Sequence, residues 1–244
     1  MQLKGSLVRA ERLTAEQRDR MCQLMTASFD SFERSGFDAD LAEKRWAILL
    51  TNGDDRIVGF STQMPMEVRA EGRRVRALFS GDTVVEPAYW GQTELVRLWG
   101  RLALRLLDQA GADPLYWFLI SMGYKTYRFL PIFFHEFYPR CDAPTPPRQQ
   151  AVLDALGRAK FPDTYDPATG VIRPNDSNCR LRPGVADIDA RRLEDPRVRF
   201  FATRNPGHAQ GHELACIAPI TRANFKPRAY TIFGRPDPVV AMEL

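Results

Sequence analysis

The amino-acid sequence predicts one domain of the α/β (α+β) class, with a mixed, mostly antiparallel central sheet flanked by helices. Residues 57–68 and 74–85 are long apolar or alternating runs on either side of residues 70–72. This pattern is typical of a β-hairpin, and Gly72 supplies the positive φ that such a turn favours. Residues 115–121 are continuously apolar, which indicates a strand buried on both faces. Helical patterns before, between and after these strands place helices against the sheet.

Ahead of the hairpin, the sequence predicts a strand and two helices. Residues 6–12 favour a short first strand. Thr14 and Gln17 have the spacing of a capping box, which predicts a helix that starts there and runs to about residue 28. A second helix is expected over residues 40–52, where Asn-Gly ends it.

Two helical segments surround the buried strand. Apolar residues recur at helical spacing over 95–107, which predicts an amphipathic helix that begins at Gln92 or Thr93. Residues 124–138 are dense in aromatic side chains and are expected to be partly helical, with Pro131 limiting the helix.

The C-terminal part of the chain is expected to complete the same domain. We place the core at residues 1–140 and a C-terminal extension at 141–244. The extension is expected to hold a helix, a long irregular segment and two strands, at 148–160, 161–183, 197–203 and 213–220.

Composition narrows the class of protein. Of 244 residues, 44% are hydrophobic, which is enough for one sizeable core or two small ones, and 26% are charged, which is ordinary for a folded protein. No run approaches the roughly 20 apolar residues that cross a bilayer, and Lys4 and Arg9 stand where a secretory signal would be apolar, so we expect a cytoplasmic protein without a membrane span. The net charge of +4 suits a polyanionic ligand, such as a phosphorylated cofactor or an acidic carrier protein, and is too small to indicate nucleic acid.

No metal site is predicted. The four cysteines are widely spaced and form no CxxC pair, so we expect reduced thiols. His208, His212 and Cys216 recur at intervals of four, but Pro206 and Gly207 favour a loop there over a helix with one metal-binding face.

The most specific stretch is 80–107, which reads SGDTVVEPAYWGQTELVRLWGRLALRLL. Together with the order of elements over 6–138, it resembles the Gcn5-related N-acetyltransferase superfamily. Members of this superfamily have a strand, then Val-x-Pro-x-Tyr-Arg-Gly-x-Gly, then a long helix. Pro87, Tyr89 and Gly91 match that pattern in kind and spacing. The resemblance implies an acyltransferase that uses a thioester donor.

A strand that turns into a helix N-terminus presents backbone N–H groups and a partial positive charge, which suit phosphate. The resemblance implies that this turn holds the pyrophosphate of coenzyme A. Trp90 stands where arginine is usual, and Thr93 and Leu95 stand where glycines are usual. The donor is therefore either acyl-CoA or an acyl-phosphopantetheine on an acyl carrier protein, or the turn binds no donor. The residues expected to bind the donor are Val84, Val85, Glu86, Trp90, Gly91, Gln92 and Thr93.

Amide formation needs a base for the amine and an acid for the departing thiolate. Asp82 lies inside the strand and Glu86 at its end, on the same face by alternation. Asp82 either serves as the base or amine ligand, or ties down a neighbouring backbone or arginine. Tyr124 and Tyr127 follow the buried strand, where the resemblance implies a tyrosine acid; the alternative is aromatic core packing. His135 is suited to acid–base work by its pKa near neutrality, or is a hydrogen-bonded packing residue.

The predicted function is transfer of an acyl group from a thioester donor to the amine or hydroxyl of a small-molecule acceptor, with an acyl carrier protein as the candidate protein partner. The many aromatic side chains either fill the core or line an apolar tunnel for a long acyl chain or an aromatic substrate. Two alternatives stay open: a non-catalytic ligand-binding protein on the same fold, and a related acyl-thioester decarboxylase or hydrolase.

Overall fold

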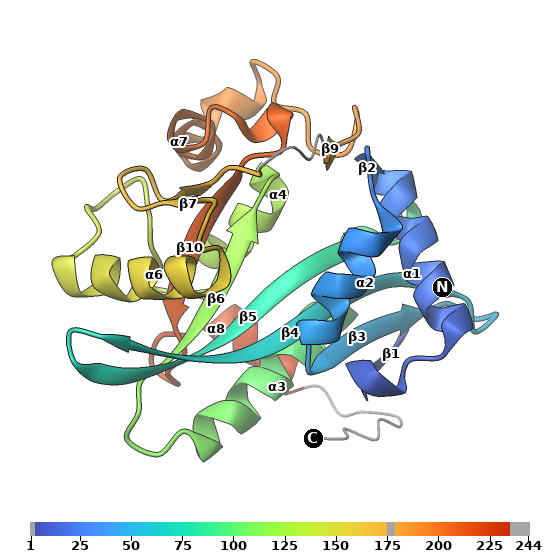
Figure 1. Cartoon of the computed structure of the whole chain (residues 1–244), viewed down its shortest axis with the longest axis horizontal. Helices are drawn as coiled ribbons and strands as arrows, with labels where there is room; N and C mark the ends of the chain where they lie inside the picture. The colour runs from blue at the N-terminus through green and yellow to red at the C-terminus, as the bar shows by residue number, and fades with distance from the viewer. Residues whose placement is uncertain (1–2, 175–178, 235–244) are drawn as a thin grey trace.

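The computed structural model describes residues 3–174 and 179–234 and arranges most of them around one eight-stranded sheet (Figure 1). Every neighbouring pair of strands is antiparallel except β5 and β6, which run parallel. This confirms the predicted fold class. Across the sheet, the strands are β1 (Lys4–Arg9), β3 (Trp46–Thr51), β4 (Ile57–Ala70), β5 (Arg73–Val85), β6 (Leu115–Ser121), β10 (Glu213–Pro219), β8 (Val171–Ile172) and β7 (Tyr165–Asp166).

Helices cover both faces of the sheet, each against its own part of the core. One face packs against α1 (Ala15–Ser28), α2 (Arg34–Glu43) and α6 (Pro147–Lys160). The other face packs against α3 (Glu94–Gln109), α4 (Tyr124–Tyr127), α5 (Phe129–Phe133), α7 (Pro196–Arg204) and α8 (Pro227–Phe233). Figure 1 shows α2 and α6 on opposite sides of the same face, with the middle of the sheet between them.

Several local features predicted from the sequence are present in the structure. The capping box at α1 is formed, with Gln17 N donating to Thr14 Oγ1 at 3.2 Å and Thr14 N donating to Gln17 Oε1 at 3.0 Å. The hairpin of β4 and β5 turns at Glu71 and Gly72, with φ values of 47° and 74°. Thr93 is the N-cap of α3, and β6 has the predicted bounds.

Two predicted elements are wrong. The helix expected over 40–52 is instead the end of α2 followed by strand β3. Residues 46–50 are buried throughout because β3 lies between β1 and β4, and a short apolar run of this kind does not distinguish strand from helix. The strand expected over 197–203 is helix α7, which Asp195 caps by accepting from Arg197 N at 2.9 Å.

The C-terminal part of the chain enters the main sheet and also builds a small second sheet. Strand β10 lies between β6 and β8, so the extension supplies an interior strand. In the second sheet, β2 (Phe29–Asp30) pairs with β9 (Arg180–Leu181), which joins the end of α1 to residues far along the chain. None of the helices in the described ranges has the length and apolar character needed to span a membrane.

Candidate active site

The parallel pair at the centre of the sheet separates partway along its length. β5 and β6 are in register from Arg76 opposite Leu115 to Ser80 opposite Leu119. Beyond that point β5 stays paired with β4 as far as Val85, whereas β6 keeps only β10 as a neighbour. The backbone groups on the facing edges of the two strands therefore lose their strand partner there and are available to a ligand.

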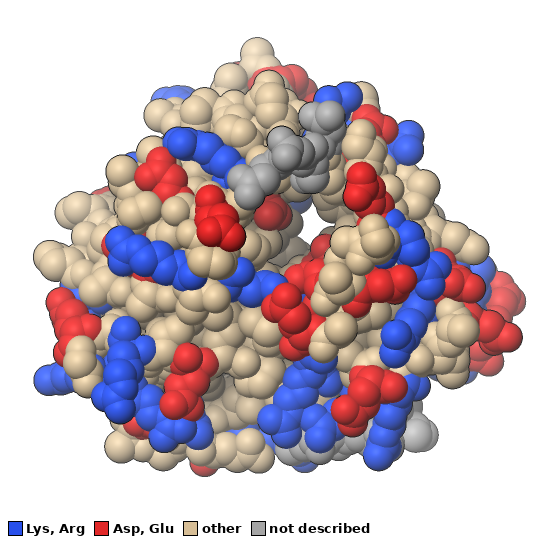
Figure 2. All heavy atoms as spheres, in the orientation of Figure 1, with Lys and Arg blue, Asp and Glu red and all other residues tan. Residues whose placement is uncertain are grey.

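A cavity of about 330 Å³ occupies this point of separation. It is lined by residues 80–83 of β5 and, on the side of β6, by Leu119, Ile120, Met122 and Gly123. Most of its remaining walls come from α1, β2, α2, β4, α3, α4, α5, β9 and the start of β10, so elements from both faces of the sheet meet at one cavity. Figure 2 shows this face of the molecule hollowed between the α2 side and the α4 side, with acidic side chains at the rim.

A β-bulge places Asp82 in the cavity. On β4 one residue, Thr62, lies opposite two residues on β5, Gly81 and Asp82. A bulge of this kind bends the strand and re-aims its side chains. The bulge needs glycine at its first position, because a Cβ on Gly81 would lie 2.7 Å from Thr62 Oγ1 and 2.8 Å from Lys44 Cε. The sequence did not reveal the bulge, although Gly81 within an apolar strand is the signal that marks one.

Hydrogen bonds on the other face of β5 hold the bulge in place. Trp117 Nε1 donates to Ser80 Oγ at 2.9 Å, and Ser80 Oγ donates to Gln63 Oε1 at 2.7 Å. Gln63 Nε2 then donates to Ser61 Oγ at 2.8 Å, and Ser61 and Thr83 share a hydroxyl hydrogen bond of 2.7 Å. This chain of side chains spans β6, β5 and β4, so it fixes the strands at the edge of the cavity.

Among the described residues, three carboxyl groups line the cavity: Asp40 of α2, Asp82 of β5 and Glu213 of β10. Asp40 is neutralised, because its two oxygens accept from Lys44 Nζ at 2.6 Å and from Lys160 Nζ at 3.1 Å. The carboxyl groups of Asp82 and Glu213 make no hydrogen bond or ion pair within the described ranges. The cavity therefore holds two partly buried carboxyl groups without a fixed partner.

The pKa values of these two carboxyl groups are raised by burial. Burial raises the pKa of Asp82 to about 7, an effect that the charge of Asp40 adds to and that Lys44 and Lys160 oppose. Burial raises the pKa of Glu213 to about 8, with further contributions from the charges of Asp82 and Asp40. A carboxyl group that titrates near neutral pH is suited to proton transfer, and such groups concentrate at functional sites.

At the face that carries α3, the cavity meets the start of that helix. Leu95 and Val96 of its first turn line the cavity, and no side chain caps α3 at Thr93. An uncapped helix start leaves N–H groups and a partial positive charge that favour an anion. The turn that precedes α3 is a 3-10 helix, Pro87–Tyr89, followed by Gly91 at a φ of 88°.

The residues that the sequence assigns to donor binding lie beside the cavity and outside its lining. They are Val84, Val85, Glu86, Trp90, Gly91, Gln92 and Thr93. Trp90 is 45% exposed, and its Nε1 donates to the carbonyl of Val85 at 2.7 Å. Lys125 of α4 places its Nζ 3.7 Å from the centre of the Trp90 ring. The indole and Lys125 thus connect the end of β5 to the segment that follows β6.

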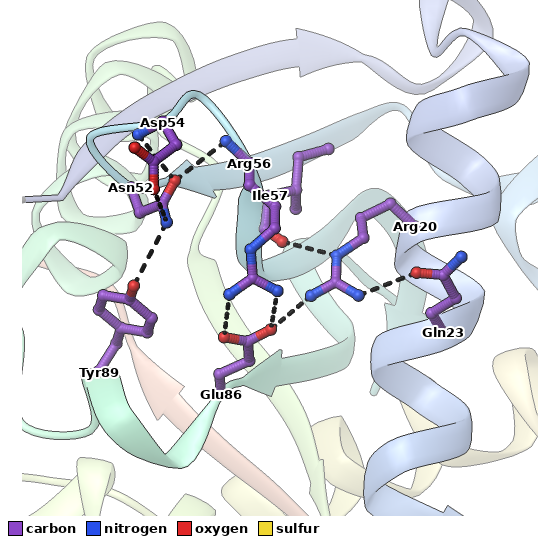
Figure 3. Close-up of polar contacts among 8 residues, drawn as sticks. All are labelled: Arg20, Gln23, Asn52, Asp54, Arg56, Ile57, Glu86 and Tyr89. Atoms are coloured by element: carbon purple, nitrogen blue, oxygen red, sulfur yellow. Dashed lines mark hydrogen bonds and ion pairs between the residues drawn. The ribbon is translucent and has the colours of Figure 1, made fainter.

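Glu86 is held in an ion-pair cluster at the end of β5 (Figure 3). Its two carboxyl oxygens accept from Arg56 at 2.9 Å each, and Arg20 of α1 donates to one of them. Arg20 Nε also donates to the carbonyl of Ile57 at 2.9 Å. The cluster joins α1, the start of β4 and the end of β5, and Glu86 does not line the cavity.

The two tyrosines and the histidine of the sequence prediction also lie outside the lining. Tyr124 and Tyr127 are buried in the core, and Tyr127 Oη donates to the carbonyl of Pro139 at 3.0 Å. Burial raises the pKa of Tyr127 well above its ordinary value. His135 is exposed, and its backbone N–H donates to the carbonyl of Asn224 at 2.9 Å. Of the five predicted catalytic residues, Asp82 is the one that the structure places in the cavity.

Asp40 and Glu213 are cavity residues that sequence reasoning missed. Glu213 directly follows Gly211 and His212 and begins an apolar strand. A charged residue at the first position of such a strand is the signal that could have indicated a carboxyl group at the edge of the core. Nothing in the linear sequence places Glu213 in the same cavity as Asp82, because that depends on the order of strands in the sheet. In the described ranges, no group of three or more side chains is arranged to hold a metal ion.

Comparison with known proteins yields similar structures and no similar sequences. No family model matches the chain, and no curated protein matches it. A protein of unknown function from Enterococcus faecalis, described as a probable N-acyltransferase, is 15% identical over 56% of this chain and 33% of its own, with a TM-score of 0.42. A GNAT-family N-acetyltransferase from Escherichia coli, in complex with CoA, is 15% identical over 55% of this chain and 70% of its own, with a TM-score of 0.38.

A third similar structure is a GCN5-related N-acetyltransferase from Anabaena variabilis, 14% identical over 52% of this chain and 31% of its own, with a TM-score of 0.39. The chain thus spans about a third of the length of the first and third of these proteins. The likeness is slight, so the chemistry of the cavity has to follow from its own residues.

Proposed function

We propose that this protein is an acyltransferase that moves an acyl group from a thioester donor to an amine in the cavity between β5 and β6. The observation that carries the proposal is the separation of these parallel strands at Ser80 and Leu119, with an uncapped helix start on one side and Asp82 on the other. Such a cavity would give an extended donor a path between the strands, and Asp82 is the candidate base beside it.

The donor is acyl-CoA or an acyl-phosphopantetheine, and the residues present fit either one. The pantetheine arm is a thin chain with two amides, which suits the unpaired strand edges beyond Ser80 and Leu119. The phosphate end would lie toward the start of α3, where Lys125 and Arg192 add positive charge. Trp90 narrows this approach, and a donor presented on an acyl carrier protein is the form that needs least space at the turn.

Asp82 would act as the general base. It takes one proton from the acceptor ammonium, the amine nitrogen attacks the thioester carbonyl, and the C–N bond forms as the C–S bond breaks. The second proton of the nitrogen passes to the departing sulfur, so the products are an amide and a thiol. A base with a pKa of about 7 is matched to this task near neutral pH. The tyrosines are assigned no step, because Tyr127 is bonded to a core carbonyl and neither tyrosine reaches the cavity lining.

Asp82→Asn tests the assignment, because it removes the base and keeps the shape of the side chain. We expect thiol release from acetyl-CoA or octanoyl-CoA in the presence of amines to fall by a factor of about 10² to 10⁴, with donor binding unchanged. Asp55→Asn is the matched control, since Asp55 is exposed and pairs with Lys4 far from the cavity. Wild-type turnover in a folded Asp82→Asn protein would refute the role of Asp82.

A ligand-binding protein without catalysis is the second candidate, and Trp90 favours it. The indole N–H donates to the Val85 carbonyl at the end of β5, so this carbonyl already has a partner. Together with Lys125, the indole would stand in the path of a donor that enters along the turn. Native mass spectrometry of the purified protein separates the two functions. A retained small molecule with no thiol release from any acyl-CoA, alone or with amines, would favour binding, whereas thiol release without an acceptor would indicate a hydrolase.

A further inference from the structure

We infer that the acceptor is a small amine with an apolar body and no carboxylate, held as an ammonium ion between Asp82 and Glu213. This inference rests on the proposed function and names the substrate class of the same cavity. It depends on the charges that line the cavity, on the apolar walls beside them, and on the segment that crosses one side of the cavity.

The charged side chains that line the cavity have one sign. Among the described lining residues, Asp40, Asp82 and Glu213 carry carboxyl groups, and none carries a basic group. The nearby lysines are already engaged, since Lys44 and Lys160 both bond to Asp40 and Lys160 also donates to Glu43 at 2.6 Å. A cation is therefore attracted to Asp82 and Glu213, and an acceptor with its own carboxylate would meet like charge without a basic partner.

An ammonium group has three hydrogen-bond donors, and the carboxyl groups of Asp82 and Glu213, which both line the cavity, can accept them.

The walls next to the carboxyl groups are apolar. Met25 and Phe29 contribute from α1 and β2, Leu181 from β9, and Phe79 and Phe161 from the side of α6. With a volume of about 330 Å³, the cavity has the size of a small-molecule site. Aliphatic and aromatic side chains of this kind stabilise an apolar body by burial and offer no hydrogen bonds to a polar one.

The β9 segment crosses one side of the cavity. Arg182 of this segment donates its backbone N–H to Ser28 at 2.9 Å and pairs with Asp30 at 3.2 Å, so the segment is tied to the end of α1. On the opposite side it lies against Gly211, where a Cβ would be 2.2 Å from the carbonyl oxygen of Cys179. Because this crossing bounds the cavity on one side, a small acceptor fits it better than a peptide that would have to pass beneath the segment.

Three ligands with matched apolar bodies test the inference: 2-phenylethylamine, L-phenylalanine and 2-phenylethanol. Calorimetric titration at pH 8 without any donor should show that 2-phenylethylamine binds at least tenfold more tightly than the other two. Glu213→Gln should weaken its binding by about tenfold, the effect of losing one charge-assisted contact, and leave 2-phenylethanol unaffected. Glu136→Gln, at an exposed residue outside the cavity, is the matched control and should change neither. Asp82→Asn is a second variant, expected to weaken the amine similarly.

Measuring transfer in parallel separates this inference from the proposed function. Amine binding without thiol release from either acyl-CoA or an acylated carrier protein would contradict the acyltransferase alone and support the amine site. The inference itself is overturned if L-phenylalanine or 2-phenylethanol binds as tightly as the amine, if no amine binds, or if Glu213→Gln changes nothing. Acylation of a lysine-containing peptide as efficiently as a small amine would also overturn it.

Discussion

Asp82 and Glu213 link the stability of this protein to pH. Both carboxyl groups have pKa values raised by burial in the folded chain, to about 7 and about 8. In the unfolded chain such groups titrate near pH 4. The folded state therefore holds protons that the unfolded state releases, and stability should fall as pH rises from about 4 toward 8. The other groups around the cavity modify this effect: Asp40, Lys44, Lys160 and Cys179 all face the pair.

The first prediction is that Glu213→Gln stabilises the protein at alkaline pH. The variant removes a charge that is costly to bury, so the free energy of unfolding at pH 8 should rise by about 2 kcal/mol and should change little at pH 5. Urea denaturation at the two pH values measures this, with Glu136→Gln as the control. A variant less stable than the wild type at pH 8 would mean that Glu213 has a stabilising partner. A gain in stability on removing a site residue is expected where function is built on unfavourable burial.

The second prediction concerns Glu86, whose oxygens accept from Arg56 and Arg20. Glu86→Gln keeps the shape and removes the charge, and it should lower the free energy of unfolding by about 1 kcal/mol because the Arg56 side is half exposed. Turnover should stay at the wild-type level. Glu67→Gln is a matched control, because its pair with Arg74 is about half exposed on both sides and should contribute less. If Glu86→Gln lost turnover without losing stability, Glu86 would have a catalytic role, as the sequence predicts.

At the scale of elements, the turn between β5 and α3 determines how a donor reaches the cavity. Trp90 stands over this turn, with its Nε1 bonded to Val85 and its ring under Lys125. The contact joins the segment after β5 to the segment after β6, beyond the point where the two strands stop pairing. The helix start behind it has no capping side chain, and the acidic Glu94 of its first turn is paired with Arg97.

The third prediction is that Trp90→Ala eases donor binding. Removing the indole releases the Val85 carbonyl and widens the approach, so KM for acyl-CoA should fall several-fold while kcat stays the same, since Trp90 does not line the cavity. Lys125→Gln is the companion variant, and it should raise KM because it removes a positive charge near the start of α3. A higher KM in Trp90→Ala would mean that the indole itself binds the donor, for example by stacking on a flat base.

For the whole molecule, the sequence predicted those features that depend on local pattern. Hairpin and helix signals at Gly72, Thr14 and Thr93 are local, and the structure confirms them. The strand at 46–51 and the helix at 196–204 were mistaken because a short apolar run has no unique period. The bulge at Gly81 and the meeting of Asp82 with Glu213 arise from strand register and strand order, which single-sequence patterns do not encode. Asp82 was found because a charge inside an apolar strand is a local signal.

The last prediction is that the core does not fold without the C-terminal extension. β10 pairs with β6 from Leu214 opposite Ser121 to Pro219 opposite Tyr116, and its residues 214–218 are fully buried. A fragment of residues 1–140 would expose the edge of β6, an apolar strand, and would leave the wall that carries Glu213 missing. Because unpaired backbone and apolar surface are both costly, we expect this fragment to aggregate or to unfold without cooperativity in circular dichroism, and co-expression with residues 141–244 to restore a cooperative transition. A monomeric 1–140 fragment with a sharp unfolding transition would show instead that the chain contains two independent folding units, in which case the cavity would lie at their junction.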